Sequence, residues 1–323
     1  MRIAVIGGTG HVGTFLVPRL VRRGHEVINL SRGRRSPFAD DETWREVRQV
    51  SVDRVVEEAA GTFARRVAEL APEVVVDMVC FTPQSAGALL IGLRGHVAHL
   101  VHCGSIWRYG PSVALPITEE NGTPPTGEYG VHKDAIARML QEESGAGGLV
   151  TTSLHPGHIS GPGWMPIGPL GNLDPGVWWT LSAGEELAIP GLGAELMHHV
   201  HAEDVAQAFE LAVEHRDAAA GHAFNVVAPS ALTVRGYAQI AASWFGQSAH
   251  LRTVGWEPLR AALAPEYAEQ SWDHLWRSQY VSIDKARSRL GFDPAHQPQD
   301  AVLQAVRWLI DHDQLRIARP LSV

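Results

Sequence analysis

Two side chains with acid–base chemistry, Tyr129 and Lys133, stand four residues apart in this sequence. The segment 129–143 has the apolar spacing of a helix, which places the two side chains on one face. A tyrosine hydroxyl has a pKa of about 10. A nearby ammonium group lowers that pKa because it favours the phenolate. The pair therefore predicts a general acid/base that exchanges a proton with an alcohol or carbonyl oxygen.

A second hydroxyl, that of Ser105, could orient the same oxygen. Ser105 lies just beyond the apolar run 99–102, and ligands of open parallel sheets bind at the carboxyl ends of the strands. The alternative use of such a serine is as a hydrolase nucleophile, whose tight turn needs glycines two residues before and two after it. Cys103 and Trp107 occupy those positions, so we expect Ser105 to hydrogen-bond a substrate rather than attack it.

A glycine-rich turn follows the first apolar run of the chain, where Gly7, Gly10 and Gly13 recur every three residues. The first glycine allows a tight exit from a strand, and the second lets the backbone approach a pyrophosphate. The third lets the following helix pack on the sheet. Free N–H groups at the start of that helix, around His11 and Val12, would face the anion. The turn therefore predicts a dinucleotide site at the head of the first helix.

Strands alternate with helices through the first half of the chain, which predicts an α/β fold with a doubly wound parallel sheet of the Rossmann type. The expected strands are 2–6, 26–30, 47–52, 74–76, 99–102, 150–154 and 223–227. The first expected helix follows the glycine-rich turn and ends at Gly24. The other expected helices are 63–70, 83–94, 129–143, 178–184, 200–214, 233–245, 283–291 and 301–311. Segment 155–176 reads as a loop, and 251–280 as irregular. We expect a dinucleotide-binding domain over 1–155, to which 200–227 returns, and a smaller substrate-binding lobe over 156–323.

The composition of the 323 residues narrows the class of protein. A hydrophobic content of 45% with 19% charged residues is typical of a globular protein with a sizeable core. No apolar run approaches the roughly 20 residues that span a bilayer, so we expect no membrane segment. The net charge of −8 argues against a nucleic-acid partner. Two cysteines in apolar runs fit buried free thiols in the reducing cytoplasm.

An ordered set of motifs resembles the extended short-chain dehydrogenase/reductase family, in its NAD(P)-dependent epimerase/dehydratase branch. The resemblance covers almost the whole chain. The matching segments are Gly7–Gly13, Ser105 with Tyr109-Gly110, Tyr129–Lys133, His155–Pro162, Val200–Ala206, Phe224–Val226 and Asp284–Gly291.

The resemblance implies a hydride transfer between a substrate carbon and a nicotinamide, with roles for the matching residues. Tyr129 would exchange the proton, Ser105 would orient the substrate oxygen, and Lys133 would also hold the nicotinamide ribose. Further cofactor contacts would come from the ends of two strands and a loop, namely Asp53 near the adenine, Cys80, Phe81, Pro156 and His158.

The end of the second strand bears on the choice of nicotinamide cofactor. An acidic residue there favours NAD, because it binds the ribose 2′-hydroxyl. Here Ser31 and Arg32 occupy that end, with Arg34 and Arg35 close by. A guanidinium and a hydroxyl suit a 2′-phosphate, so the sequence favours NADP over NAD.

Departures from the family pattern narrow the reaction. Dehydratases of this branch carry an Asp-Glu pair directly after the active-site hydroxyl residue, where this chain has Ile106 and Trp107, so we do not expect dehydration. Nucleotide-sugar members place an arginine where this chain has Met197, which removes an anchor for a diphosphate. We expect the substrate to contact Trp107, Trp164, Met197 and His199. His199 could share a strand face only with His201, so we expect no metal site.

Several functions stay open on the sequence alone. The first is a reductase, dehydrogenase or epimerase that acts at a secondary alcohol or ketone of a sugar or sugar-like molecule. A nucleotide-sugar 4-epimerase is the alternative. A non-catalytic cofactor-sensing or RNA-binding protein is the third reading, but the retained Tyr129–Lys133 pair and the acidic charge argue against it. The resemblance also suggests a homodimer built from helices 83–94 and 129–143.

Overall fold

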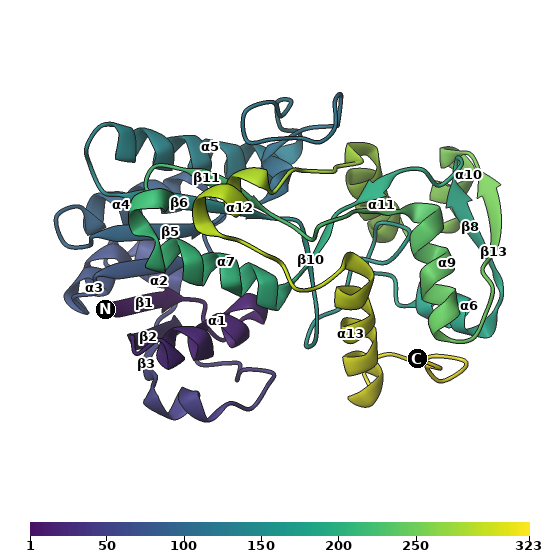
Figure 1. Cartoon of the computed structure of the whole chain (residues 1–323), viewed down its shortest axis with the longest axis horizontal. Helices are drawn as coiled ribbons and strands as arrows, with labels where there is room; N and C mark the ends of the chain where they lie inside the picture. Colours follow the sequence, from purple (N-terminus) through teal and green to yellow (C-terminus); the bar gives the residue numbers. More distant parts are fainter.

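The computed structural model describes residues 1–323, and its centre is a parallel sheet of seven strands in the order β11-β6-β5-β4-β1-β2-β3 (Figure 1). The strands are β1 (Arg2–Ile6), β2 (Glu26–Ser31), β3 (Arg48–Ser51), β4 (Val74–Asp77), β5 (His99–Cys103), β6 (Thr151–Pro156) and β11 (Ala223–Val226). The strand order reverses at β1, between β2 and β4. The doubly wound α/β fold is therefore confirmed, and the reversal creates a crevice at the carboxyl ends of these strands.

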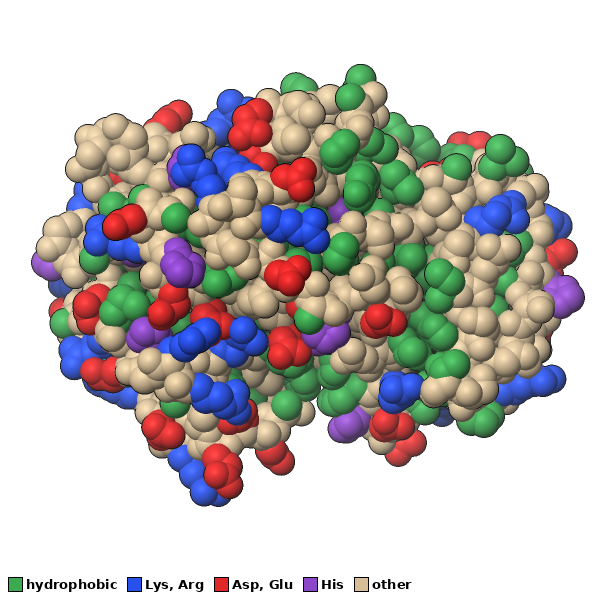
Figure 2. All heavy atoms as spheres, viewed as in Figure 1, with side chains coloured by type: hydrophobic (Ala, Val, Ile, Leu, Met, Phe, Trp, Pro, Cys, Tyr) green, Lys and Arg blue, Asp and Glu red, His purple; other side chains and the backbone are tan.

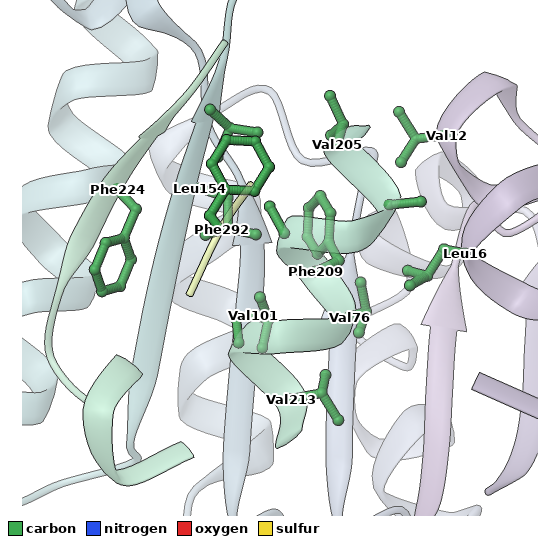
Figure 3. Packing of buried hydrophobic residues seen from close by; sticks show 14 of the residues in the cluster. Val12, Leu16, Val76, Val101, Leu154, Val205, Phe209, Val213, Phe224 and Phe292 are labelled. Carbon is green, nitrogen blue, oxygen red and sulfur yellow. The ribbon is translucent and has the colours of Figure 1, made fainter. Parts of the chain in front are cut away.

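Both faces of the sheet are buried, because side chains alternate along each strand. In β1, Ile3 and Val5 join one hydrophobic cluster, whereas Ala4 and Ile6 join another. The first cluster lies under α1 (His11–Arg22), α7 (Ala202–Glu214) and α12 (Asp284–Leu290). The second lies under α3 (Phe63–Glu69), α4 (Pro83–Leu93) and α5 (Gly127–Gly145). Figure 3 shows Phe209 of α7 above the sheet, among side chains of the strands.

The remaining elements form a second part with its own core, on the right of Figure 1. Its helices are α6 (Gly176–Ala183), α9 (Val234–Trp244), α10 (Trp256–Ala262), α11 (Pro265–Arg277) and α13 (Pro298–Asp311). Its strand pairs are β8 (Glu186–Pro190) with β13 (His250–Val254) and β9 (Leu196–Met197) with β12 (Leu232–Thr233). Figure 2 shows charged side chains over the part with the large sheet, and hydrophobic ones along the middle of the same face. No helix is long and apolar enough to cross a membrane.

Two segments are more regular than the sequence predicts. The expected loop 155–176 contains the end of β6 and then β7 (His158–Ser160), which pairs in parallel with β10 (His199–His201). The segment 251–280, expected to be irregular, holds most of β13 with α10 and α11. Both predictions failed for the same reason. The short strands and helices in these segments are stabilised by contacts with residues distant in sequence, which no local pattern reveals.

Shorter elements complete the chain. They are η1 (Glu42–Glu46), α2 (Arg54–Ala59), η2 (Ile106–Arg108) and α8 (Arg216–Ala219). The helix expected from residue 200 begins instead at Ala202, because the imidazole of His201 caps it by accepting the backbone N–H of Glu203 at 3.0 Å.

Candidate active site

The glycine-rich turn joins β1 to α1 without room for side chains. Gly7 has φ of 92°, a conformation that other residues rarely adopt. A Cβ atom on Gly13 would lie 2.3 Å from the carbonyl oxygen of Gly8, and one on Gly10 would lie 3.2 Å from that of Gly7. No side chain caps the first turn of α1. Its N–H groups are therefore available to an anion, with the positive end of the helix dipole behind them.

A cleft of about 610 Å³ opens beside this turn, at the strand crevice. It is lined by the glycine turn, including His11 and Val12, and by the ends of β1 to β5. Its charged lining residues are Arg32, Arg34, Arg35, Arg54 and Asp53. Arg54 is held by Asp77 at 2.8 Å, which leaves three arginines and one carboxylate without a salt bridge inside the cleft. The part of the cleft next to β2 and β3 therefore carries a net positive charge.

These features fit a nicotinamide dinucleotide. The pyrophosphate would meet the N–H groups around Gly10 to Gly13, and the adenosine would lie beside Ser31, Arg32 and Asp53. The hydroxyl of Ser31 accepts the backbone N–H of Gly33 at 3.2 Å, and Asp53 caps α2 by accepting the N–H of Val56 at 3.4 Å. Both side chains are thus fixed at the rim before any ligand binds.

Lys133 lies where the cleft meets α5. It is only 1% exposed, and its Nζ donates hydrogen bonds of 2.8 Å to the carbonyl oxygens of Cys80 and Cys103. The same Nζ lies 4.9 Å from the ring centre of Phe81 and 5.7 Å from that of Tyr129. Desolvation lowers the pKa of this lysine, opposed by nearby thiol and carboxyl groups.

Tyr129 and Ser105 meet beside this lysine. The Ser105 side chain lies close enough to Tyr129 to affect the pKa of its hydroxyl, and the Ser105 hydroxyl accepts the backbone N–H of Trp107 at 3.1 Å. Desolvation raises the pKa of Tyr129 to about 12, and the neighbouring Ser105 opposes that rise. The expected net lowering of this pKa is not found in the chain alone, because desolvation is the largest effect on the tyrosine and both hydrogen bonds made by the Lys133 ammonium group go to backbone carbonyls.

Other predicted cofactor residues are distributed around this centre. Phe81 lines the cleft and is 53% exposed, whereas Cys80 is buried and contributes its carbonyl to Lys133. Pro156 and His158 lie outside the cleft lining, and Ile159 takes the place expected for them. Cys103, which sequence reasoning left unassigned, also lines the cleft. Its position as the last residue of β5, at the carboxyl end of the strand, is the signal that could have identified it.

Trp164, which the sequence predicts to contact substrate, lines the same cleft as the glycine-rich turn. Its indole stacks on the imidazole of His11, with ring centres 5.3 Å apart, and the guanidinium of Arg35 lies 5.7 Å from the indole centre. Burial lowers the pKa of His11 to about 4, so the imidazole is neutral at physiological pH. Trp164 comes from the segment after β7, and only the tertiary fold brings it over the turn.

The predicted substrate residues Met197 and His199 are both fully buried. Met197 lies in the hydrophobic core of the second part. The Nδ1 of His199 pairs with the Ser160 hydroxyl at 2.9 Å, while its Nε2 has no hydrogen-bond partner. The structure also brings Glu203 and His296 beside His201, a grouping that the sequence spacing did not show.

A chain of rings connects Tyr129 to the second part. The ring centre of Trp107 lies 5.7 Å from that of Tyr129 and 4.8 Å from that of His274. The ring centres of His274 and His158 are 5.0 Å apart. Burial holds the pKa of His158 well below its usual range and that of His274 at about 4, so both are neutral. His274 was missed from sequence because α11 was not expected.

Comparison with known proteins agrees with this geometry. The NAD dependent epimerase/dehydratase family matches residues 3–227 of this chain. A UDP-glucose 4-epimerase of Corynebacterium glutamicum is 28% identical over 324 residues, 92% of each chain. A 2′-dehydrokanamycin reductase of Streptomyces kanamyceticus is 30% identical over 209 residues, 64% of this chain and 56% of that one.

Among solved structures, an epimerase of Methanothermobacter thermautotrophicus superposes with a TM-score of 0.75 at 20% identity, over 97% of this chain and 93% of that one. The fold and the site together define a nicotinamide-dependent enzyme, an oxidoreductase or epimerase. The chain belongs to the NAD dependent epimerase/dehydratase family.

Proposed function

We propose that this enzyme transfers hydride reversibly at a secondary alcohol or ketone of a sugar or sugar-like molecule, with Tyr129 as the general acid/base. The observation that carries the proposal is that Ser105 and the ammonium group of Lys133 both lie near Tyr129, and that the same ammonium group contacts Phe81 and Cys103 of the cleft lining. Two hydroxyl groups at this place can both reach one substrate oxygen. A nicotinamide bound in the cleft would supply or accept the hydride.

Tyr129, Ser105 and Lys133 have different roles in the proton transfer. With a pKa of about 12, Tyr129 is protonated at neutral pH and ready to donate to the oxygen of a ketone as that oxygen gains charge. Ser105 is held by the Trp107 N–H, so its hydroxyl can position the same oxygen. In the reverse direction the fixed ammonium of Lys133 stabilises the phenolate electrostatically.

The residues around the ring chain support a hydroxyl-rich substrate. The ring nitrogens of His158 and the Nε2 of His199 are buried without hydrogen-bond partners, and hydroxyl groups would satisfy them. The relatives named above act on UDP-glucose and 2′-dehydrokanamycin, which also favours the sugar class. Met197 cannot anchor a diphosphate, because it is buried, so a sugar without a nucleotide is the first candidate. A nucleotide-sugar 4-epimerase is the second, favoured by the match to UDP-glucose 4-epimerase over 92% of both chains.

The cofactor we propose is NADP. Arg32, Arg34 and Arg35 line the cleft, and no carboxylate follows β2 to bind a 2′-hydroxyl. A charge-assisted hydrogen bond contributes about 1.5–3 kcal/mol, so Arg32→Ala should weaken NADPH binding tenfold or more and leave NADH binding nearly unchanged. Arg45→Ala is the matched control, since Arg45 is exposed and lies outside the cleft. Equal losses for both cofactors would overturn the preference.

One experiment tests the reaction itself. The enzyme is incubated with free monosaccharides, an aminoglycoside and UDP-glucose, and the absorbance of the reduced nicotinamide is followed alongside product analysis. A reductase consumes reduced cofactor stoichiometrically, whereas an epimerase converts its substrate without net consumption. Tyr129→Phe should abolish turnover while dinucleotide binding persists. Undiminished turnover by that variant would refute the assignment.

We further propose a cytoplasmic homodimer, with residues 1–155 and 200–227 binding the dinucleotide and the rest of 156–323 binding substrate. The exposed apolar side chains of Ile91 on α4 and Val131 on α5 support a dimer face on these helices. Light scattering should give twice the mass of the 35.1 kDa chain, and Ile91→Asp should halve it.

A further inference from the structure

A second cleft, of about 450 Å³, lies between α10 and α11 of the second part. Trp256, Glu257 and Arg260 of α10 line it together with Glu269 and Trp272 of α11. It shares no lining residue with the dinucleotide cleft. The proposed hydride transfer makes no use of it.

Three neighbouring indole rings, which we call the tryptophan ladder, are those of Trp256 and Trp272, which line this cleft, and of Trp276, which stacks on Trp272 outside the lining. The ring centres of Trp256 and Trp272 are 5.0 Å apart, and those of Trp272 and Trp276 are 6.1 Å apart with planes only 10° from parallel. Trp272 and Trp276 are 45% and 43% exposed. Adjacent exposed indoles of this kind mark a binding surface, because single scattered apolar residues are the ordinary case.

The charges beside the ladder indicate what it binds. Glu257 is paired with Arg260 at 3.7 Å, and Asp273, which also lines the cleft, is paired with Arg277 at 3.3 Å. Glu269 has no cationic partner, so the cleft carries one uncompensated carboxylate beside the rings. Indole faces attract cations and cover apolar surface, and the free carboxylate attracts an amine. Phosphorylated or carboxylated ligands would be repelled.

We propose that the tryptophan ladder binds amine-bearing sugar rings, with the ring faces over the indoles and an ammonium group on Glu269. This goes beyond the proposed reaction, because binding at the ladder requires no hydride transfer. The opposite side of α11 carries His274 and Arg277, which lie 4.8 Å and 4.1 Å from Trp107 of the catalytic site. One helix therefore borders both sites, which suits a ligand of several rings.

The test uses three trisaccharides that share a β-1,4-linked glucose backbone and differ only at C2. Cellotriose carries hydroxyl groups there, chitotriose acetamides, and the fully deacetylated chitosan trimer ammonium groups. Binding is measured by tryptophan fluorescence and by calorimetry at low salt. The chitosan trimer should bind about tenfold more tightly than cellotriose, and added salt should remove most of that difference.

Single substitutions separate the contribution of the indole rings from that of the Glu269 carboxylate. Trp272→Ala should weaken binding of the chitosan trimer about tenfold. Glu269→Gln, which keeps the rings and the fold, should abolish the preference for the ammonium form and retain cellotriose binding. The matched control is Trp179→Ala, since Trp179 of α6 is 47% exposed in the same part of the molecule but outside the cleft.

Three results would overturn the proposal. They are equal binding of all three trisaccharides or of none, equal losses in Trp272→Ala and Trp179→Ala, and a fall to half mass in light scattering for Trp272→Ala. The last would make the ladder a contact between two copies of this chain. Turnover in the cofactor assay is scored separately, so a failure here is distinguishable from a failure of the proposed reaction.

Discussion

Gly13 is packed directly against the backbone of Gly8 in the glycine-rich turn, so Gly13→Ala tests whether this turn needs a residue without a side chain. The added Cβ would lie 2.3 Å from the oxygen, 2.5 Å from the carbon and 2.6 Å from the Cα of Gly8. All three atoms are backbone, so no side chain can rotate away. The start of α1 and the turn would have to separate by roughly 1 Å, an overpacking that costs about 1–3 kcal/mol.

The same displacement moves the first-turn N–H groups of α1 away from a bound pyrophosphate. Hydrogen bonds weaken steeply when lengthened by this amount, and a charge-assisted one contributes about 1.5–3 kcal/mol. We therefore expect Gly13→Ala to lower dinucleotide affinity about tenfold to a hundredfold, together with an earlier urea midpoint. Calorimetry with NADPH and urea unfolding followed by circular dichroism measure the two effects.

The matched control is Gly145→Ala at the end of α5, where an added Cβ meets no atom within 4 Å. This change should leave affinity unchanged and stabilise the fold by up to about 1 kcal/mol, because alanine is the better helix former. Wild-type affinity and stability in Gly13→Ala would refute the reasoning, since the turn would then not be packed as described.

Three further predictions concern titrating and buried groups. Because the pKa of Tyr129 is raised to about 12, alcohol oxidation should accelerate with rising pH through the alkaline range while ketone reduction stays level near neutrality; a pH–rate profile in each direction checks this, and level profiles in both would contradict it. Lys133→Met leaves two buried carbonyl oxygens without their donor and should lower the free energy of unfolding by about 1–3 kcal/mol, read from urea titrations; an unchanged midpoint would oppose it. The hydrogen bond from Arg94 lowers the pKa of Glu143 from 4.5 to about 2, so this carboxylate stabilises the fold above pH 4.5 and loses that effect as the pH falls toward 2. Glu143→Gln should therefore flatten the loss of thermal stability in that window, and identical curves for variant and wild type would count against the pair.

Short-range patterns made much of the fold and part of the site predictable. The helix with Tyr129 and Lys133 and the turn with Gly7 to Gly13 follow from spacing within a few residues, and both are found where expected. The helix expected over 233–245 also forms, and Thr233 caps it by accepting the N–H of Gly236 at 3.0 Å. Such features are encoded locally, because backbone geometry and side-chain spacing decide them before any distant contact forms.

The errors have the opposite character. The pairing of β7 with β10 joins residues about forty positions apart, and α11 reaches the candidate site through contacts of its His274 with Trp107 and His158. No local pattern predicts such contacts, since they depend on how the second part packs against the sheet.

The sequence by itself determined the chemistry, a dinucleotide turn with a tyrosine, a lysine and a serine, because those residue types and spacings act over one helix or one strand end. Only the tertiary structure decided which side chains surround these residues and how those surroundings change the pKa of Tyr129. It placed Trp164 on His11 at the cleft beside the glycine-rich turn, brought the neutral His274 and His158 together next to Trp107, and raised the pKa of Tyr129. The physical reason is that stacking and desolvation depend on neighbours far away in the chain, which only the folded molecule brings together.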